Sequence, residues 1–342
     1  MNELSAYEVA GRLSLGEDFG PWLEELQALG PHEKRARIPA APETAAVLER
    51  LGVTHSDVAE ILHGLPKVER DPALAWLLER CHHRLVRDLG RFGAEVGEWP
   101  NLPDALGAPG RYFYTYVFLA ALEDIRGWHR QRGIPDDVSW ATLADLGRQM
   151  ALHRKMYGRG GLDTQWWLVL HWRGALYELG RLQFGPYRIA AGTDSSEIWY
   201  ADDVSARMGP GFRRGDPALG VHIPETGPLT PAACDHSLAW ARDFFARHGP
   251  EQKYRIATCV SWLLDDQLEE YLPADSNLVR FQRRFRLVPG AEENDVEIFK
   301  FVFKSATPTT AGVSQRTTLE RAIVGHLRAG RHWRVRTGWL EL

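Results

Sequence analysis

The chain has 342 residues, enough for two domains that each bury a core, and its 44% hydrophobic and 25% charged content is ordinary for a protein folded nearly throughout. The net charge of -4 disfavours a nucleic-acid partner, and without a long apolar run or a signal pattern we expect neither export nor membrane insertion. The 3 cysteines have no paired spacing, which argues against a disulfide framework or a zinc site and favours a reducing cytoplasm.

The first half of the chain is predicted to be helical. Between residues 43 and 180 the apolar side chains recur at helical spacing. Helices expected over residues 140–157 and 165–182 could belong to either half, and the glycine-rich stretch 158–161 between them is the most flexible point. We therefore divide the chain into a helical N-terminal domain, residues 1–160, and a second domain, residues 161–342.

The second half combines short strands with helices. Strands are expected where β-branched and aromatic residues cluster or alternate, and helices where apolar residues follow helical spacing behind a capping residue. The expected strands are residues 183–191, 197–200, 219–223, 254–264, 286–288, 297–304 and 332–342. The expected helices are residues 231–248, 276–285 and 317–329. The predicted fold class is α+β, an all-helical domain followed by a mixed α/β domain.

The end of the expected strand near residue 223 is the first candidate site. Apolar residues alternate there with His222, so the imidazole faces away from them. Pro224 removes a backbone donor, so either the neighbouring strand stops pairing and the sheet opens, or the proline merely ends the strand. Open α/β sheets bind ligands beyond the carboxyl ends of their strands, which places a functional site near Glu225 and Leu264.

Two helix starts supply candidate anion-binding groups. Thr230 is a good N-cap, and the free N–H groups of its helix, approached by flexible Gly227, could hold a phosphate. In the later helix Arg280, Arg283 and Arg284 share one side, which suits a polyphosphate. The alternative is a solvated basic surface whose arginines pair with nearby acidic residues. Those acidic residues are Glu269, Glu270 and Asp275.

Motifs of several other enzyme classes are missing from the sequence. It has no Walker loop, no glycine-rich dinucleotide fingerprint and no Gly-x-Ser-x-Gly nucleophile elbow. His82 and His83 are adjacent on an expected helix, where side chains diverge and cannot share a metal without outside ligands. Four tryptophans could line an acyl pocket, although helical and strand tryptophans are more often packing residues: Trp166, Trp167, Trp172 and Trp199.

Several strings between residues 220 and 285 resemble a family of two-domain bacterial acyltransferase-like proteins. They are His-Ile-Pro-Glu-Thr-Gly-Pro-Leu at 222–229, Ser-Trp-Leu-Leu-Asp at 261–265, Leu-Pro-Ala-Asp-Ser-Asn at 272–277 and Val-Arg-Phe-Gln at 279–282. The second domain of that family is similar to the GNAT superfamily of N-acyltransferases. The resemblance implies a sheet that splays between strands 219–225 and 254–264 to admit the pantetheine arm of coenzyme A. Coenzyme A or acyl-CoA is then the expected co-substrate, without a metal.

If the chain is such an acyltransferase, an amine of a small-molecule or peptide acceptor attacks the thioester directly. Glu225 or His222 would remove a proton, directly or through water, and Ser261 would protonate the leaving thiolate. A covalent route through Cys259 ranks lower, because no histidine adjacent in sequence activates it. The residues expected to contact the pantetheine arm or the phosphates are Gly227, Thr230, Asn277 and Arg280.

Two alternatives remain at this point. The pyrophosphate loop of the GNAT superfamily carries Gln or Arg followed by spaced glycines, and residues 225–230 depart from that pattern. The first alternative is therefore a catalytically degenerate GNAT-like module that binds a ligand or regulates a partner. In the second, an acyl carrier protein supplies the thioester, and the three arginines of the later helix meet its acidic surface.

Overall fold

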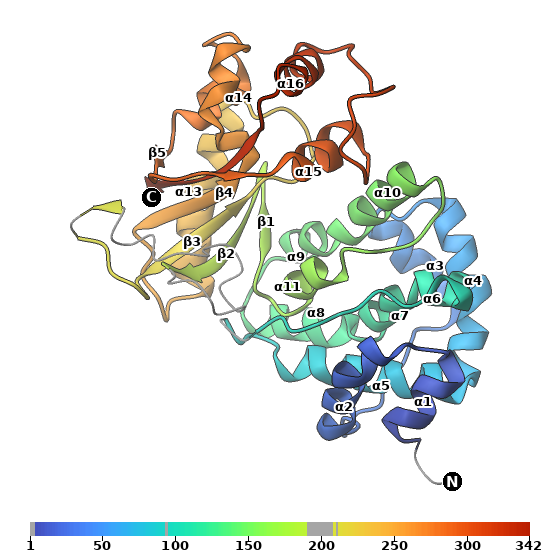
Figure 1. Cartoon of the computed structure of the whole chain (residues 1–342). Coiled ribbons are helices and arrows are strands. Elements are labelled where there is room, and N and C mark those ends of the chain that lie inside the picture. Colours follow the sequence, from blue (N-terminus) through green and yellow to red (C-terminus); the bar gives the residue numbers. More distant parts are fainter. Residues whose placement is uncertain (1–3, 93–94, 190–207, 210) are drawn as a thin grey trace. The chain divides into compact units, whose positions relative to one another are not determined.

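Figure 1 shows the computed structural model of the chain. The structure describes residues 4–92, 95–189, 208–209 and 211–342. The chain divides into two compact units, Met1–Ala175 and Leu176–Leu342. This division follows Ala175, whereas the sequence analysis placed it after residue 160, since the helix Gln165–Trp172 belongs to the first unit.

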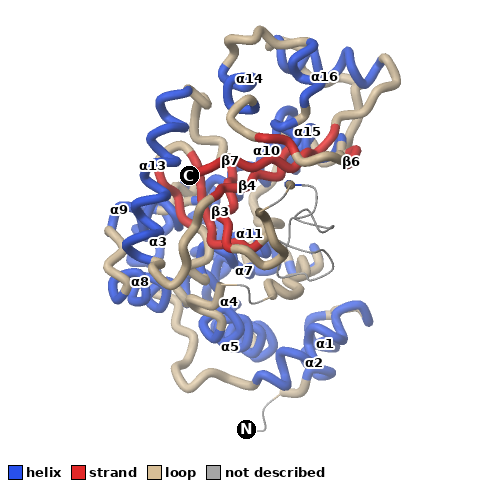
Figure 2. Tube along the Cα trace, turned by 90° about the vertical axis from the view of Figure 1, so that its left-hand side faces the viewer, coloured by secondary structure: helices blue, strands red, loops and turns tan. Residues whose placement is uncertain are grey.

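The described part of the first unit is built from helices (Figures 1 and 2). They are α1 Ala6–Leu13, α2 Gly20–Leu29, α3 Ala41–Arg50, α4 His55–Arg70, α5 Pro72–Arg87, α6 Ala108–Arg111, α7 Phe113–Ala120, α8 Leu122–Gln131, α9 Asp136–Leu143, α10 Asp145–Tyr157 and α11 Gln165–Trp172. Side-chain caps fix several starts: the Thr54 hydroxyl accepts from the Asp57 N–H, and the Asp71 carboxylate accepts from the N–H groups of Ala73 and Leu74. Such caps satisfy donors that a helix start leaves unpaired.

The centre of the first unit is α7, in which every residue is buried. Tyr112, the residue just before α7, and Tyr116 within it connect this helix to α4. The Tyr112 hydroxyl donates to the Asp57 carboxylate at 2.7 Å, and the Tyr116 hydroxyl donates to the Ile61 carbonyl at 2.8 Å. Because buried hydroxyls cost free energy unless they are hydrogen-bonded, these contacts let the aromatic rings of α7 form a dry core.

The described part of the second unit contains a mixed sheet of seven strands, drawn in red in Figure 2. The strands are β1 Tyr177–Leu179, β2 Leu182–Arg188, β3 Pro217–His222, β4 Ile256–Ser261, β5 Arg286–Leu287, β6 Glu292–Glu293 and β7 Arg334–Glu341. Their order is β1-β2-β3-β4-β7-β5, and β6 pairs with β7. Only β3 and β4 pair in parallel; the other described pairs are antiparallel. The predicted α+β class is confirmed.

The helices of the second unit connect these strands. They are α13 Pro231–His248, α14 Asn277–Gln282, α15 Asp295–Ile298 and α16 Thr318–Arg328, with 3-10 turns η4 Trp262–Leu264 and η5 Asp266–Glu270 and a π-helical turn η6 Phe299–Phe303. The helix α13 crosses between the two parallel strands and lies against β1 and β2. Its Phe244 and Phe245 contact the Tyr177 ring, with centroids 4.9 and 6.0 Å apart. Across the described residues, no helix has the length and apolarity needed to span a bilayer.

The ladder between the two central strands is short, which agrees with the splay that the resemblance implied. The parallel strands β3 and β4 are joined through only two residue pairs, Leu219 with Ala257 and Gly220 with Thr258. Beyond them β3 continues to His222 while paired with β2, and β4 continues to Ser261 while paired with β7. Past these two pairs, β3 and β4 still have backbone N–H and C=O groups on their facing edges. These groups are outside the ladder.

Two expected elements are wrong, and one lies outside the described residues. Residues 297–304 were expected to form a strand but lie in α15 and η6, because an unbroken apolar run cannot distinguish a strand from a buried helix. The start is fixed by Asn294, whose side chain accepts from the Glu297 N–H. The expected helix 165–182 ends at Trp172, and Tyr177–Leu179 forms β1. The expected strand 197–200 cannot be compared.

Candidate active site

His222 ends β3, and its imidazole contacts Tyr187 of β2. The Tyr187 hydroxyl lies 3.1 Å from His222 Nε2, and the two ring centroids are 5.7 Å apart. A Cβ atom at Gly220 would lie 1.7 Å from two carbons of the Tyr187 ring. The missing side chain at Gly220 thus makes room for the tyrosine that reaches His222. Tyr187 was not singled out from the sequence, although a glycine inside a strand signals such a close approach.

Glu225 lies three residues beyond β3 and is exposed, with 69% of its side chain accessible. Its carboxylate forms an ion pair with the Lys304 ammonium, which also donates to the Phe301 carbonyl at 2.7 Å. Lys304 follows η6 and has a positive φ of 54°. Before Glu225 could accept a proton from a substrate amine, its carboxylate would have to break the ion pair with Lys304 or bind the amine and Lys304 at the same time.

Ser261 and Cys259 lie on the same face of β4, with different exposure. The Ser261 hydroxyl oxygen accepts from the Leu263 N–H at 3.1 Å, so its O–H remains a donor. Cys259 is buried, and burial raises the pKa of its thiol to about 12. A thiol with that pKa is almost entirely protonated at neutral pH, which argues against it as a nucleophile.

The loop between β3 and α13 holds Gly227 and Thr230. Gly227 is exposed and has φ +138°, a conformation that residues with a Cβ rarely adopt. Thr230 is the N-cap of α13, and its hydroxyl accepts from the Ala233 N–H at 3.3 Å. Because Pro231 has no N–H and Ala233 is capped, helix geometry leaves the Ala232 N–H as an open donor at this helix start.

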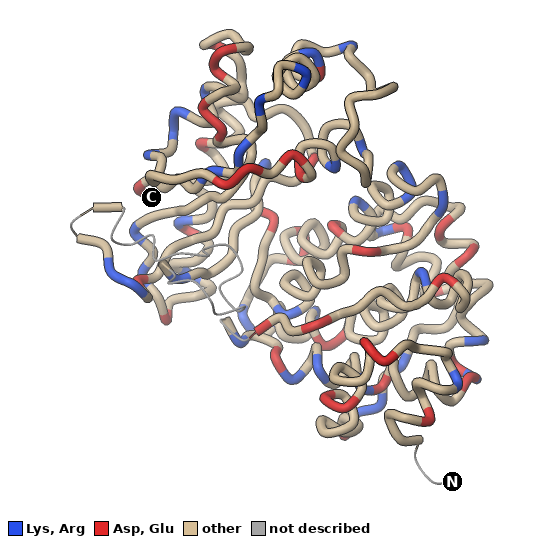
Figure 3. The backbone as a smooth tube through the Cα atoms, viewed as in Figure 1, with Lys and Arg blue, Asp and Glu red and all other residues tan. Residues whose placement is uncertain are grey.

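The arginines in α14 and just after it do not act as one group. Arg283 pairs with Glu269 at 2.8 Å, which is the alternative that the sequence left open, and Arg284 pairs with Asp235 of α13. Within the described residues Arg280 has no ion pair, and both it and Asn277 are exposed. Acidic and basic residues are interspersed along the second unit (Figure 3).

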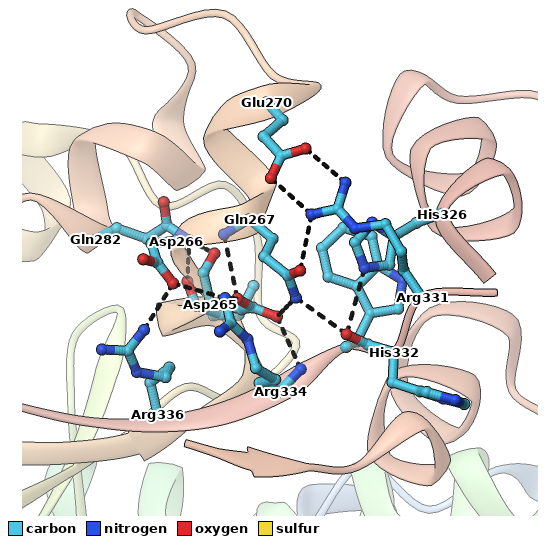
Figure 4. Close-up of polar contacts among 12 residues, drawn as sticks. Asp265, Asp266, Gln267, Glu270, Gln282, His326, Arg331, His332, Arg334 and Arg336 are labelled. Atoms are coloured by element: carbon cyan, nitrogen blue, oxygen red, sulfur yellow. Dashed lines mark hydrogen bonds and ion pairs between the residues drawn. The ribbon is translucent and has the colours of Figure 1, made fainter. Parts of the chain in front are cut away.

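A buried polar network follows β4 and was not foreseen (Figure 4). Asp265 is fully buried and accepts from the Arg334 N–H at 2.7 Å and from the Arg334 guanidinium at 3.2 Å. It also accepts from the backbone and side-chain N–H groups of Gln267. Gln282 of α14 donates to the carbonyls of Leu263 and Asp265. These contacts fix the chain between β4 and α14.

No metal-binding cluster is present in the part of the chain that the structure describes, since no three His, Cys, Asp or Glu side chains gather there. His82 instead pairs with Asp124 at 3.1 Å, and His83 contacts the Gly30 carbonyl at 3.0 Å.

Comparison with known proteins decides the family. Residues 42–174 match the N-acyltransferase N-terminal domain, and residues 176–340 match the GNAT-like C-terminal domain. The chain belongs to this two-domain acyltransferase family. No curated protein sequence matches the chain significantly.

Solved acyltransferases resemble the chain over its whole length. An acyltransferase in complex with decanoyl-CoA and teicoplanin is 44% identical, with a TM-score of 0.89, over 99% of this chain and 100% of that one. A structure with CoA and 10C-teicoplanin is also 44% identical, with a TM-score of 0.88 and the same coverage. A third, with decanoyl-CoA, is 43% identical, with a TM-score of 0.88 and the same coverage. The chain is therefore an enzyme, a GNAT-like acyltransferase that uses acyl-CoA.

Proposed function

We propose that this acyltransferase moves a medium-length acyl group from coenzyme A to an amine of a teicoplanin-like glycopeptide. The observation that carries the acceptor is the likeness, at 44% identity and full coverage, to an acyltransferase crystallised with decanoyl-CoA and teicoplanin. The splay between β3 and β4 supports the donor, because the amide groups of a pantetheine arm can pair with backbone groups that the sheet leaves outside its ladder.

Reaction requires a neutral amine and a polarised thioester. An alkylammonium has an ordinary pKa of about 10.4, so little of the acceptor is nucleophilic at neutral pH unless a base removes its proton. Attack on the carbonyl carbon then forms the C–N bond, places negative charge on the thioester oxygen and expels the coenzyme A thiolate. Backbone N–H groups near the end of β3 would stabilise that oxygen.

His222 is the base that the geometry supports best. It is partly buried at the end of β3, where the strands diverge, and the Tyr187 hydroxyl contacts its Nε2 atom at 3.1 Å. Tyr187 would orient the imidazole as it accepts the amine proton. Glu225 is the alternative base, and its ion pair with Lys304 makes it the weaker candidate.

Ser261 and the phosphate-binding groups complete the proposal. β3 and β4 are parallel, so Ser261 lies at the same edge of the sheet as His222, with an O–H able to donate to the leaving thiolate. The loop containing Gly227 and the α13 start capped by Thr230 would hold the pyrophosphate. Asn277 and Arg280, exposed on α14, would contact the pantetheine arm or the phosphates.

The proposed reaction is tested with the full-length chain, decanoyl-CoA and teicoplanin lacking its acyl group. Mass spectrometry should show the acceptor gaining one decanoyl group, and thiol release should match product formation. No product and no thiol release, with tight decanoyl-CoA binding, would exclude this acceptor. Comparing the rate of acyl transfer from decanoyl-CoA with the rate from a decanoyl carrier protein shows whether the donor is coenzyme A or a protein-bound thioester.

The catalytic residues are tested by variants compared under saturating donor. His222→Gln should lower kcat by about 100-fold or more, the usual contribution of a general base, and Tyr187→Phe by about tenfold. Glu225→Gln should retain most activity if His222 is the base. The opposite ranking, with a large loss for Glu225→Gln and a small one for His222→Gln, would assign the base to Glu225.

The degenerate binding module is not favoured, because the comparisons support an enzyme. The cytoplasmic location expected from the cysteines stays a prediction; all three cysteines are free and buried.

A further inference from the structure

We propose that Arg181 is a positioning residue for the pyrophosphate of coenzyme A, acting through the loop between β3 and α13. Arg181 lies in the turn between β1 and β2. Its Nη1 atom donates to the Pro224 carbonyl at 2.7 Å, and its Nε atom donates to the Gly227 carbonyl at 2.9 Å. This inference rests on the proposed use of the loop as the phosphate site.

The two contacts set the direction of the loop backbone. Pro224 and Gly227 are three residues apart, and one planar guanidinium holds both of their carbonyl oxygens. With these oxygens turned toward Arg181, the carbonyl dipoles that would repel a phosphate are occupied. Gly227, at φ +138°, provides the backbone reversal that this arrangement needs.

Arg181 is also held firmly from its own backbone. Its N–H donates to the buried Ser237 hydroxyl of α13 at 2.7 Å. A Cβ atom at the preceding Gly180 would lie 2.9 Å from the same hydroxyl oxygen, so the turn approaches α13 closely. Arg181 therefore connects the β1–β2 turn, in which it lies, with both the β3–α13 loop and the first half of α13.

The charge of Arg181 lies near the start of α13. Burial raises the pKa of the Cys234 thiol in the first turn of that helix, while the positive charges of Arg284 and Arg181 oppose the rise. Arg284 is paired with Asp235, whereas burial lowers the pKa of Arg181 and the nearby carboxylate of Glu178 opposes that change. The guanidinium charge and the positive end of the helix both favour a bound diphosphate.

This chain departs from the glycine-rich loop pattern of the GNAT superfamily, and Arg181 offers a physical explanation. A loop with several glycines can turn its N–H groups toward a phosphate by itself. Here Pro224 and Pro228 lack N–H groups, and a side chain from another turn fixes the carbonyls instead. The loop conformation is thus imposed from outside the loop.

The experiment compares two donors, decanoyl-CoA and decanoyl-pantetheine, of which the second lacks the whole 3′-phosphoadenosine diphosphate and therefore the pyrophosphate. Arg181→Met keeps the alkyl stem and removes the guanidinium. We expect kcat/KM for decanoyl-CoA to fall at least about tenfold, mainly through KM, while kcat/KM for decanoyl-pantetheine changes less than about twofold. Arg181→Lys should recover part of the loss, because an ammonium restores the charge but not the two-point contact.

Arg188→Met is the matched control. Arg188 ends β2 and also donates to a loop carbonyl, that of Gly215 at 2.8 Å, but outside the β3–α13 loop. Arg188→Met should leave kcat/KM unchanged for both donors. If Arg181→Met lowers kcat/KM equally for both donors, Arg181 has only a general structural role and the proposal is overturned. The proposal is also overturned if kcat/KM falls for neither donor.

Binding measurements separate this proposal from the proposed function. Calorimetry with coenzyme A and with pantetheine needs no acceptor and no turnover. If the wild-type chain binds coenzyme A but acylates no glycopeptide, the acceptor assignment fails while the Arg181 test still applies. Should wild-type bind coenzyme A no more tightly than pantetheine, the loop holds no phosphate and the role of Arg181 is excluded. If Arg181→Met does not fold, Arg181→Lys is compared with the same two donors, and a smaller loss confined to decanoyl-CoA is expected.

Discussion

Gly220 of β3 pairs with Thr258 of β4, and the parallel ladder ends at this pair. Each strand continues beyond it with a partner on its outer side, β3 with β2 as far as His222 and β4 with β7 as far as Ser261. The early end of the parallel ladder is therefore not caused by fraying, because both strands remain hydrogen-bonded to their outer neighbours beyond it. His222 and Ser261 are the last residues of the two strands past this end.

The first prediction concerns Gly220→Ala. The added Cβ would lie 1.7 Å from the Tyr187 ring, so the ring must move, and with it the hydroxyl that contacts His222. Overpacking of this kind costs about 1–3 kcal/mol of folding free energy. We expect a lower thermal midpoint together with a loss of kcat at least as large as that of Tyr187→Phe.

Gly325→Ala is the matched control for this change. Gly325 is exposed in α16, and no heavy atom lies within 4 Å of a Cβ built there. Since alanine favours a helix over glycine by about 1 kcal/mol, this variant should be slightly more stable and fully active. Normal kcat in Gly220→Ala would show that the Tyr187 ring does not position the base.

The sequence predicted that the pairing of β3 with its neighbour would stop, but not where it stops. Pro224 suggested that pairing stops because a donor is missing, yet the ladder already ends at Gly220, four residues earlier. Beyond that pair β3 and β4 are paired with the strands on their outer sides. Strand periodicity specifies which face a residue occupies, whereas the last paired residue depends on tertiary contacts that one sequence does not reveal.

Cys259→Ala tests the direct route against a covalent one. Burial raises the pKa of the Cys259 thiol to about 12, so a thiolate is scarce at neutral pH. We expect the variant to keep kcat within about twofold, with a modest loss of stability from the small cavity. A decanoyl group found on Cys259 after rapid quenching, or an inactive folded variant, would contradict direct transfer.

Asp265→Asn tests the network that fixes the chain after β4. The carboxylate is fully buried and accepts four hydrogen bonds, two from Arg334 and two from Gln267 (Figure 4). Asparagine keeps one acceptor oxygen but places an amide N–H opposite N–H donors, so a buried donor loses its partner at a cost of about 1–3 kcal/mol. Urea denaturation should show a loss of this size for the second unit.

Asp266→Asn provides the comparison for Asp265→Asn. Asp266 is the next residue and also pairs with Arg334, at 3.1 Å, and with Arg336, at 2.6 Å, but its side chain is 56% exposed. Exposed ion pairs contribute about 0–1 kcal/mol, so this variant should be close to wild-type. Equal losses for the two neighbours would mean that burial does not set the contribution of this network.

Several partners in the site could not have been predicted from the sequence. Glu225 pairs with Lys304, 79 residues away, and Arg284 pairs with Asp235, 49 residues away. Pattern rules reach only neighbours on one helix or one strand, so they offered Arg284 partners close in sequence. The helix α13, by contrast, has the predicted bounds 231–248, because its cap and its apolar spacing are local signals.

The last prediction concerns the pH dependence of the first unit. His129 is buried, with Nδ1 2.7 Å from the Ser139 hydroxyl, and burial together with the charge of Arg126 lowers its pKa to about 3. In the unfolded chain its pKa is about 6.5, so between these values only the unfolded form takes up a proton. The free energy of unfolding should therefore fall as the pH decreases through this window, by about 1.4 kcal/mol per pH unit from this residue alone.

The contribution of His129 is isolated by comparing variants, because carboxylates with lowered pKa values also lose stabilisation in acid. His129→Gln should show a shallower fall in the urea midpoint between pH 6 and pH 4.5, approximate bounds chosen between the two pKa values. His55→Gln should keep the wild-type slope, since the His55 side chain is 92% exposed. An unchanged slope in His129→Gln would mean that the folded chain protonates His129 in this range, which requires the packing around Ser139 to open well before the unit unfolds.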